Sequence, residues 1–121
     1  MILTGLLSGD KLYQMISKCK INVHPSYEEG WGTVICEAMA CGLPVVAWDL
    51  PVYRTIYPKG IVKIPVGELK KFSESILELL TNKRLYDKIS KEAQEVASKY
   101  DWNKIAEEET NILRKIVSRE M

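Results

Sequence analysis

The sequence predicts an α/β fold in which a mostly parallel sheet is covered by helices. Short apolar runs alternate with amphipathic helical patterns, residues 45–48 are apolar at every position, and the last third contains helical patterns only. A strand without polar alternation is typical of a parallel sheet that is covered on both faces. The order of elements therefore predicts three layers, a truncated doubly wound domain with closing C-terminal helices.

Composition limits the possible partners. The 121 residues carry a net charge of +1, so charge gives no reason to expect nucleic acid as a partner. No run approaches the ~18 apolar residues of a membrane span, which leaves only peripheral membrane attachment open. Cys19, Cys36 and Cys41 form no Cys-x-x-Cys pair. We expect small buried thiols in a reducing, cytoplasmic protein, not disulfides or zinc ligands.

The first elements lead to a glycine loop. Residues 1–7 are apolar and are expected to form a short strand with its exit. Ser8 is placed to cap the helix that follows, whose apolar face begins at Leu12. The run 21–24 is expected to be a strand that Pro25 stops, because proline lacks the N–H of a sheet ladder.

The glycine loop precedes a short helix. Gly30 and Gly32 flank Trp31, and glycine permits positive φ or close approach to a ligand. Apolar residues then recur at helical spacing from Thr33, until Gly42 with a following proline stops the helix after about two turns.

This arrangement predicts an anion site. A glycine loop that enters a helix beyond the end of a strand presents free N–H groups and a positive helix dipole, which favour phosphate. Two carboxylates, Glu29 and Glu37, flank the site. They would repel phosphate on contact, so we expect them to accept hydrogen bonds from hydroxyl groups of the same ligand. The alternatives are that Glu37 lies on a solvated helix face and that the glycines only make a turn.

The remaining elements are predicted scaffold. Pro51 is placed to start a short helix over 52–56; Tyr53 and Arg54 face either the ligand or the solvent, and we expect the solvent. Residues 61–64 form a further predicted strand. Three helices follow, with Asn82 and Asp101 as caps for the last two. We expect the apolar stripe of each helix to be buried in the core, and the members of these stripes are Leu69, Phe72, Ile76, Leu79, Leu80, Leu85, Ile89, Ala93, Val96, Tyr100, Trp102, Ile105, Ala106, Ile112, Leu113, Ile116 and Val117.

Residues 25–47 read Pro-Ser-x-x-Glu-Gly-Trp-Gly-x-x-x-x-Glu-Ala-Met-Ala-Cys-Gly-x-Pro-Val-Val-Ala. This run resembles the signature of retaining glycosyltransferases of family 4, which have the GT-B fold with Rossmann-like domains. Glu29 and Glu37 match the two acids of the family's Glu-x7-Glu motif. The resemblance implies that Glu37 holds ribose hydroxyls of a nucleotide sugar and that Glu29, the catalytic residue, faces the transferred sugar. It further implies that the backbone of Gly30, Trp31, Gly32 and Thr33 lies against the sugar and diphosphate.

The same resemblance implies a domain organisation. Residues 1–121 would be one partial C-terminal domain, without its first strands and without the N-terminal domain that supplies the acceptor site. The family's Arg and Lys that contact the diphosphate find no match here, since no Arg precedes Arg54. The implied reaction transfers a hexose from a nucleoside diphosphate sugar to a hydroxyl acceptor, without metal or cofactor. We expect the isolated chain to be inactive, and a homodimer is compatible with its exposed apolar surface.

Two rival interpretations stay open at this point. The chain could be a non-catalytic nucleotide-binding or interaction module, which the unmatched Arg and Lys favour. It could also come from a GT-B epimerase or phosphorylase, which would act on the donor without an acceptor.

Overall fold

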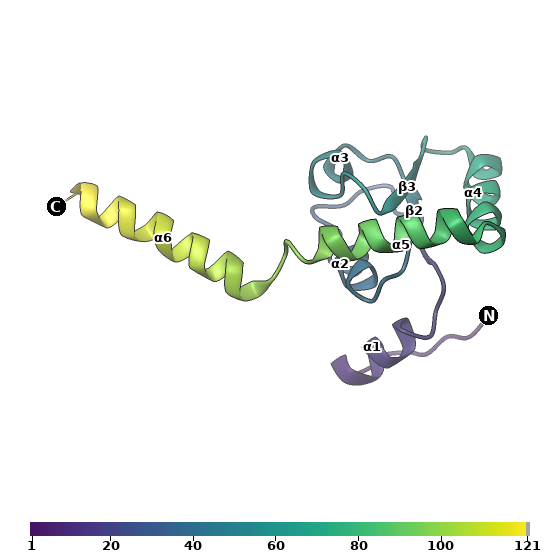
Figure 1. Cartoon of the computed structure of the whole chain (residues 1–121), viewed down its shortest axis with the longest axis horizontal. Helices are drawn as coiled ribbons and strands as arrows, with labels where there is room; N and C mark the ends of the chain where they lie inside the picture. Colours follow the sequence, from purple (N-terminus) through teal and green to yellow (C-terminus); the bar gives the residue numbers. More distant parts are fainter. Residues whose placement is uncertain (121) are drawn as a thin grey trace.

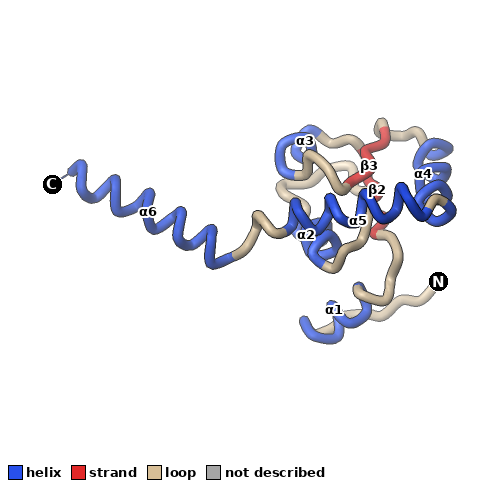
Figure 2. The backbone as a smooth tube through the Cα atoms, in the orientation of Figure 1, coloured by secondary structure: helices blue, strands red, loops and turns tan. Residues whose placement is uncertain are grey.

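The computed structural model describes residues 1–120, and of Glu120 the backbone only. Three strands and six helices follow one another along this part of the chain (Figures 1 and 2). Their bounds are α1 Gly9–Ile16, β1 Asn22–His24, α2 Thr33–Ala40, β2 Val45–Trp48, α3 Pro51–Ile56, β3 Ile61–Ile64, α4 Leu69–Thr81, α5 Lys83–Ala97 and α6 Trp102–Glu120.

The three strands form one parallel sheet in the order β1-β2-β3. Every residue of the central strand β2 is buried. Because successive side chains of a strand point to opposite faces, this burial shows that both faces of β2 are covered. Helices α2 and α4 contact the sheet, and α5 packs against both helices. Phe72 of α4 packs on Trp48 at the end of β2, with ring centroids 4.6 Å apart. The predicted α/β class with a parallel sheet is confirmed.

Helix α2 has the predicted length of about two turns, and glycines bound it at both ends. Gly32 at its N-cap has φ +81°, and Gly42 after its end has φ +78°. The N–H of Gly42 donates to the carbonyl of Met39 at 2.9 Å, which turns the chain out of the helix, and Pro44 then leads into β2. The apolar side of α2 buries Ile35 and Met39.

The turn before β3 is pressed against α5. Gly60 is buried with φ +76°, and a Cβ on it would lie 2.5 Å from both Cα and N of Ala93. The N–H of Gly60 donates to Oε2 of Glu92 at 3.3 Å, and Lys59 forms an ion pair with Glu95. Glycine is therefore required here both by its backbone conformation and by the close approach of a helix backbone.

The N-terminal segment departs from the expectation of a strand. Residues 1–8 contain no strand, and Gly5 within them has φ +63°, which interrupts an extended conformation. The large side chains Met1, Ile2, Leu3 and Leu6 are all exposed. Ser8 does occupy the N-cap of α1, but its side chain makes no capping hydrogen bond. Figure 1 shows this segment and α1 beside the sheet domain instead of within it.

The three cysteines are free, but they are not all buried as predicted. Cys36 and Cys41 are half-buried, whereas Cys19 is exposed. Cys19 follows α1, a helix that has no buried residue. The prediction that Cys19 is buried was wrong, because the helix that precedes it contributes little to the core.

The three closing helices differ in how much of the apolar stripe of each is buried. Helix α5 buries Ala93 and Val96, and α4 buries Phe72 and Leu79 but leaves Leu69 and Leu80 exposed. The caps are as predicted. Oδ1 of Asn82 accepts from Leu85 N at 3.0 Å, and Oδ1 of Asp101 accepts from Asn103 N at 2.8 Å.

The stripe of α6 is not part of the core, which corrects the prediction. Figure 1 shows α6 extending away from the rest of the chain. Trp102 is 83% exposed, and Ile112, Leu113, Ile116 and Val117 are about half exposed. Apolar periodicity shows that a helix face favours burial, but it does not identify the surface that buries it. No helix in the described part of the chain is long and apolar enough to cross a membrane.

Candidate functional site

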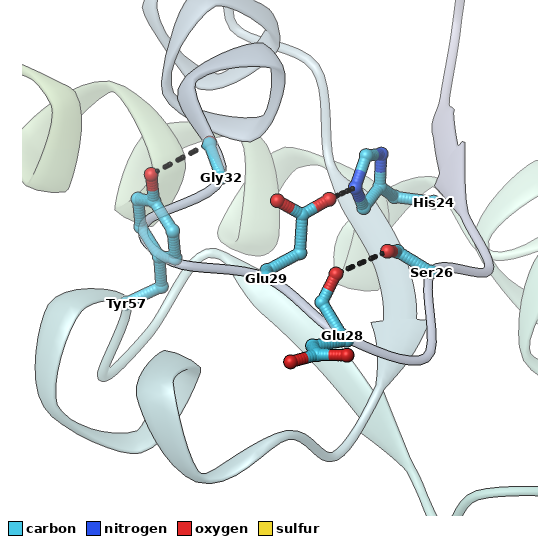
Figure 3. A network of polar contacts seen from close by, with 6 residues as sticks. All are labelled: His24, Ser26, Glu28, Glu29, Gly32 and Tyr57. Atoms are coloured by element: carbon cyan, nitrogen blue, oxygen red, sulfur yellow. Dashed lines mark hydrogen bonds and ion pairs between the residues drawn. The ribbon is translucent and has the colours of Figure 1, made fainter.

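The candidate site is the loop between β1 and α2, beyond the carboxyl end of the parallel sheet (Figure 3). Ligands of such sheets bind at this end. The loop begins at Pro25, and the Ser26 hydroxyl donates to the Glu28 carbonyl at 2.9 Å, which closes a local turn. This turn sends the two consecutive glutamates in different directions. The Glu29 carboxylate points toward His24, whereas the Glu28 carboxylate points away from it.

Glu29 is held by the last residue of β1. Its Oε1 lies 2.7 Å from Nε2 of His24, and the two side chains are only 24% and 19% exposed. This hydrogen bond, assisted by Ser26, holds the pKa of Glu29 below its ordinary value, against an opposing effect of burial. Since an ionised carboxylate only accepts hydrogen bonds, Nε2 of His24 carries the shared hydrogen.

Gly32 closes the loop and starts α2. Its carbonyl accepts from the buried Tyr57 hydroxyl at 2.9 Å and from Ile35 N at 2.9 Å. A Cβ at Gly32 would lie 3.3 Å from Ile35 Cδ1 and from Tyr53 Cε1. Of the two predicted glycines, Gly32 alone uses a positive φ, whereas Gly30 is exposed with open space where a side chain would project.

The N-terminus of α2 has no side-chain cap, because Gly32 occupies the capping position. The first amides of a helix have no partner within the helix. Thr33, the first residue of α2, is exposed. The start of α2 therefore presents donors and the positive end of a helix dipole to a ligand.

Glu37 lies one turn into α2 and faces α1. Its Oε1 accepts from the Tyr13 hydroxyl at 3.3 Å, and its charge raises the pKa of Tyr13. A cavity of about 660 Å³ opens here, and Thr33, Glu37, Trp31 and Tyr100 are among its lining residues. Glu29, Gly30 and Gly32 are not among them. The structure thus brings three predicted site residues to this cavity and places the other three along the adjoining loop.

Trp31 uses its ring for packing. The ring meets Tyr57 and Tyr100 edge to face, with centroid distances of 5.7 and 5.0 Å. The Tyr100 hydroxyl donates to the carbonyl of Ile56 at 2.8 Å. Trp31 therefore fixes the loop to the turn that follows α5.

The expectation that Tyr53 and Arg54 face the solvent is half correct. Arg54 is exposed and forms an ion pair with Asp49 at 2.9 Å. Tyr53 is completely buried beneath Gly32, and its hydroxyl has no hydrogen-bond partner among the described residues. Burial, with a contribution from the charge of Glu29, raises the pKa of Tyr53 to about 12. A six-residue helix is too short for periodicity to show which side is buried.

Sequence reasoning missed two partners of the predicted acids, His24 and Tyr13. The contact of Tyr13 could have been anticipated, because Tyr13 lies on a helix that was predicted to pack against the rest of the chain. No sequence pattern indicated the contact of His24 with Glu29, since this contact depends on the path of the intervening turn.

Comparison with known proteins identifies the family. Residues 1–96 match the sequence model of the family described as glycosyl transferases group 1. A sulfoquinovosyl transferase of Arabidopsis thaliana is 35% identical over 107 residues, which cover 84% of this chain and 21% of that protein. A phosphatidyl-myo-inositol mannosyltransferase of Mycobacterium leprae (strain TN) is 35% identical over 80 residues, which cover 64% of this chain and 21% of that protein.

A solved structure has a closely similar fold. The sucrose-phosphate synthase from Thermosynechococcus elongatus matches with a TM-score of 0.85 at 25% identity, over 98% of this chain and 30% of that one. This chain spans about a fifth of the length of the two curated relatives named above. The resemblance to glycosyltransferases with the GT-B fold is confirmed at this level. The chain belongs to the family of group 1 glycosyl transferases.

Proposed function

We propose that this chain forms the nucleotide-sugar-binding part of a retaining, family 4 glycosyltransferase. The reaction would move a hexose from a nucleoside diphosphate sugar to a hydroxyl acceptor. One observation carries the proposal: Glu29 lies in the loop that leads to the uncapped start of α2, and Glu37 lies one turn into that helix, beyond the carboxyl end of β1. Such a loop and helix start offer donors for a diphosphate and acceptors for sugar hydroxyls.

Each residue has a proposed role in donor binding. Amides at the start of α2 would stabilise the charge that develops on the leaving diphosphate. Glu37 would accept hydrogen bonds from ribose hydroxyls in place of the Tyr13 hydroxyl that it now holds. Glu29 would face the transferred sugar as the catalytic residue. The backbone from Gly30 to Thr33 would lie along the ligand.

The domain organisation is part of the proposal. We place this chain in the C-terminal, donor-binding domain, with the acceptor site and the opposite wall of the cleft on another domain. The exposed apolar stripe of α6 is consistent with packing against such a body. We expect no sugar transfer by residues 1–121 alone, and transfer by this chain would contradict that expectation. The free thiols suit a reducing, cytoplasmic setting.

The test is a binding titration of the folded chain by ligand-observed NMR with UDP, GDP, ADP and their hexose conjugates. We expect saturable binding of one nucleotide, which Glu37→Ala weakens by roughly fivefold to tenfold, the loss of about 1 kcal/mol of hydrogen bonding. Glu28→Ala is the control, because that carboxylate points away from the site. Binding that is equally affected by both substitutions, or no binding, would contradict the proposal and favour an interaction module. Conversion of the donor without an acceptor would favour an epimerase or phosphorylase.

A further inference from the structure

The geometry of His24 gives this residue a role that the family motif does not assign. His24 ends β1, where its backbone pairs in register with Ala47 of β2. Pro25 follows at once and restricts the conformation of His24 to the extended region. The imidazole is therefore carried by a strand whose position is fixed by the sheet on one side and by a proline on the other. A side chain with these constraints is a firm support for a neighbour.

His24 contacts one oxygen of Glu29 and leaves the other available. Nε2 lies 2.7 Å from Oε1, within the range of a charge-assisted hydrogen bond. Figure 3 shows the second carboxylate oxygen turned away from the imidazole. A carboxylate fixed through one oxygen presents the other in a defined direction, which reduces the ordering cost of binding a hydroxyl group.

The other groups around Glu29 do not take the place of His24. Tyr53 of α3 and Tyr57, which follows α3, are both close enough to sense the Glu29 charge. The Tyr57 hydroxyl donates to the Gly32 carbonyl, and the Tyr53 hydroxyl has no hydrogen-bond partner among the described residues, so neither holds the Glu29 carboxylate. The Glu28 carboxylate points away from the network. The Ser26 hydroxyl bonds to the Glu28 carbonyl and also lowers the pKa of Glu29, by less than His24 does. Among the described residues, His24 makes the hydrogen bond that holds the Glu29 carboxylate, at 2.7 Å.

We propose that His24 is a positioning residue for Glu29: it anchors Oε1 so that Oε2 accepts a hydroxyl of the hexose in the bound nucleotide sugar. The proposal rests on the proposed function for the identity of the ligand. It goes further by assigning the recognition of the sugar, as distinct from the nucleotide, to a pair of residues. Residues outside the pair would hold the nucleotide.

Two substitutions at position 24 separate donation from size. His24→Leu keeps a side chain of similar bulk and removes the donor. His24→Gln places an amide N–H at about the reach of Nε2, and so restores a donor without an imidazole. Glu28→Gln neutralises the adjacent carboxylate that does not touch His24, and it serves as the matched control. All variants are made in the full chain of 121 residues, and folding is checked by circular dichroism.

The first measurement uses no ligand. The carboxyl ¹³C resonance of Glu29 is titrated with pH in each variant. The wild-type midpoint is expected below the ordinary range for glutamate, as the His24 hydrogen bond requires. We expect His24→Leu to raise the midpoint, while His24→Gln and Glu28→Gln stay closer to wild type. An unchanged midpoint in His24→Leu would show that the pair does not hold the carboxylate, and the proposal would be overturned.

The second measurement compares a nucleoside diphosphate with its hexose conjugate, and takes the ratio of their dissociation constants as the contribution of the sugar. We expect His24→Leu to reduce this contribution by about fivefold, the factor for one hydrogen bond, and to leave the affinity for the nucleotide alone unchanged. His24→Gln is expected to recover most of the loss. Equal losses for both ligands, or no loss for either, would overturn the proposal.

Failure of the proposed function is distinguishable from failure of this inference. If no nucleotide binds to the folded chain, the donor site fails, and the role of His24 toward a sugar fails with it. The carboxyl titration would still report whether His24 holds Glu29. If the nucleotide binds but the sugar contribution does not depend on His24, the donor site stands and only the positioning role is wrong.

Discussion

The contact between Gly60 and α5 allows a prediction whose size follows from the geometry. In Gly60→Ala the new Cβ would lie 2.5 Å from Cα and N of Ala93, which are backbone atoms that no rotamer change can move. Gly67 offers a matched control. It has a similar φ, +89° against +76°, but nothing lies within 4 Å of its Cβ position. Both alanine variants bear the left-handed backbone strain of about 1–2 kcal/mol, and both gain the same small stabilisation through the unfolded chain.

The difference in free energy of unfolding between the two variants therefore measures the cost of the steric clash alone. Forcing one extra methyl group into a packed contact costs about 1–3 kcal/mol, so we expect Gly60→Ala to be less stable than Gly67→Ala by about 2 kcal/mol. Urea unfolding followed by circular dichroism measures this directly. With an m-value of about 2 kcal/mol/M, the midpoint of Gly60→Ala should lie roughly 1 M below that of Gly67→Ala. Midpoints that agree within error would refute the idea that the turn before β3 is pressed against α5.

Three further predictions concern other parts of the chain. Tyr57→Phe removes the buried hydroxyl that donates to the Gly32 carbonyl, and urea unfolding should show a loss of about 1 kcal/mol. Leu79→Ala, at a buried position of α4, should cost about 2–5 kcal/mol, whereas Leu113→Ala on the exposed face of α6 should stay within about 0.5 kcal/mol. The pKa of Glu29 is lower in the folded chain than in the unfolded chain. The ionised carboxylate therefore contributes to the free energy of unfolding above its unfolded pKa, and this contribution is lost as the pH falls through the folded pKa. The difference in stability between wild type and Glu29→Gln should accordingly close below about pH 4.

Each of these predictions has an outcome that would contradict it. Unchanged stability in Tyr57→Phe would mean that the hydroxyl bond has no net effect. Equal losses in Leu79→Ala and Leu113→Ala would mean that the chain covers α6 in solution. A gap for Glu29→Gln that is independent of pH would mean that the carboxylate is not held by a hydrogen bond in the folded state.

The sequence predicted the central elements well, for identifiable physical reasons. The unbroken apolar run of β2 has one stable environment, the middle of a covered parallel sheet, and all four of its residues are buried there. Helix α2 is bounded by two glycines with positive φ, so both of its ends are determined by nearby residues. The caps at Asn82 and Asp101 are likewise local, because each bond spans two or three residues.

The errors arose where the answer depends on distant parts of the molecule. The apolar pattern of α6 is regular, yet its burial requires a partner surface that the pattern does not describe. Tyr53 lies beneath Gly32 because of how α3 docks, and a helix of six residues carries too little periodicity to reveal it. The pair of His24 and Glu29 follows from the course of a turn. At the candidate site, the motif singled out Glu29 and Glu37 but did not reveal their hydrogen-bond partners, His24 and Tyr13.

The position of Tyr100 has a mechanical consequence. This residue lies in the turn between α5 and α6; the Trp31 ring rests against it at 5.0 Å, and its hydroxyl is bonded to the carbonyl of Ile56. A rotation of α6 about the turn would displace the phenol and, with it, the support of the loop that carries Glu29. One aromatic side chain thus joins the loop that carries Glu29 to the turn from which α6 leaves the domain.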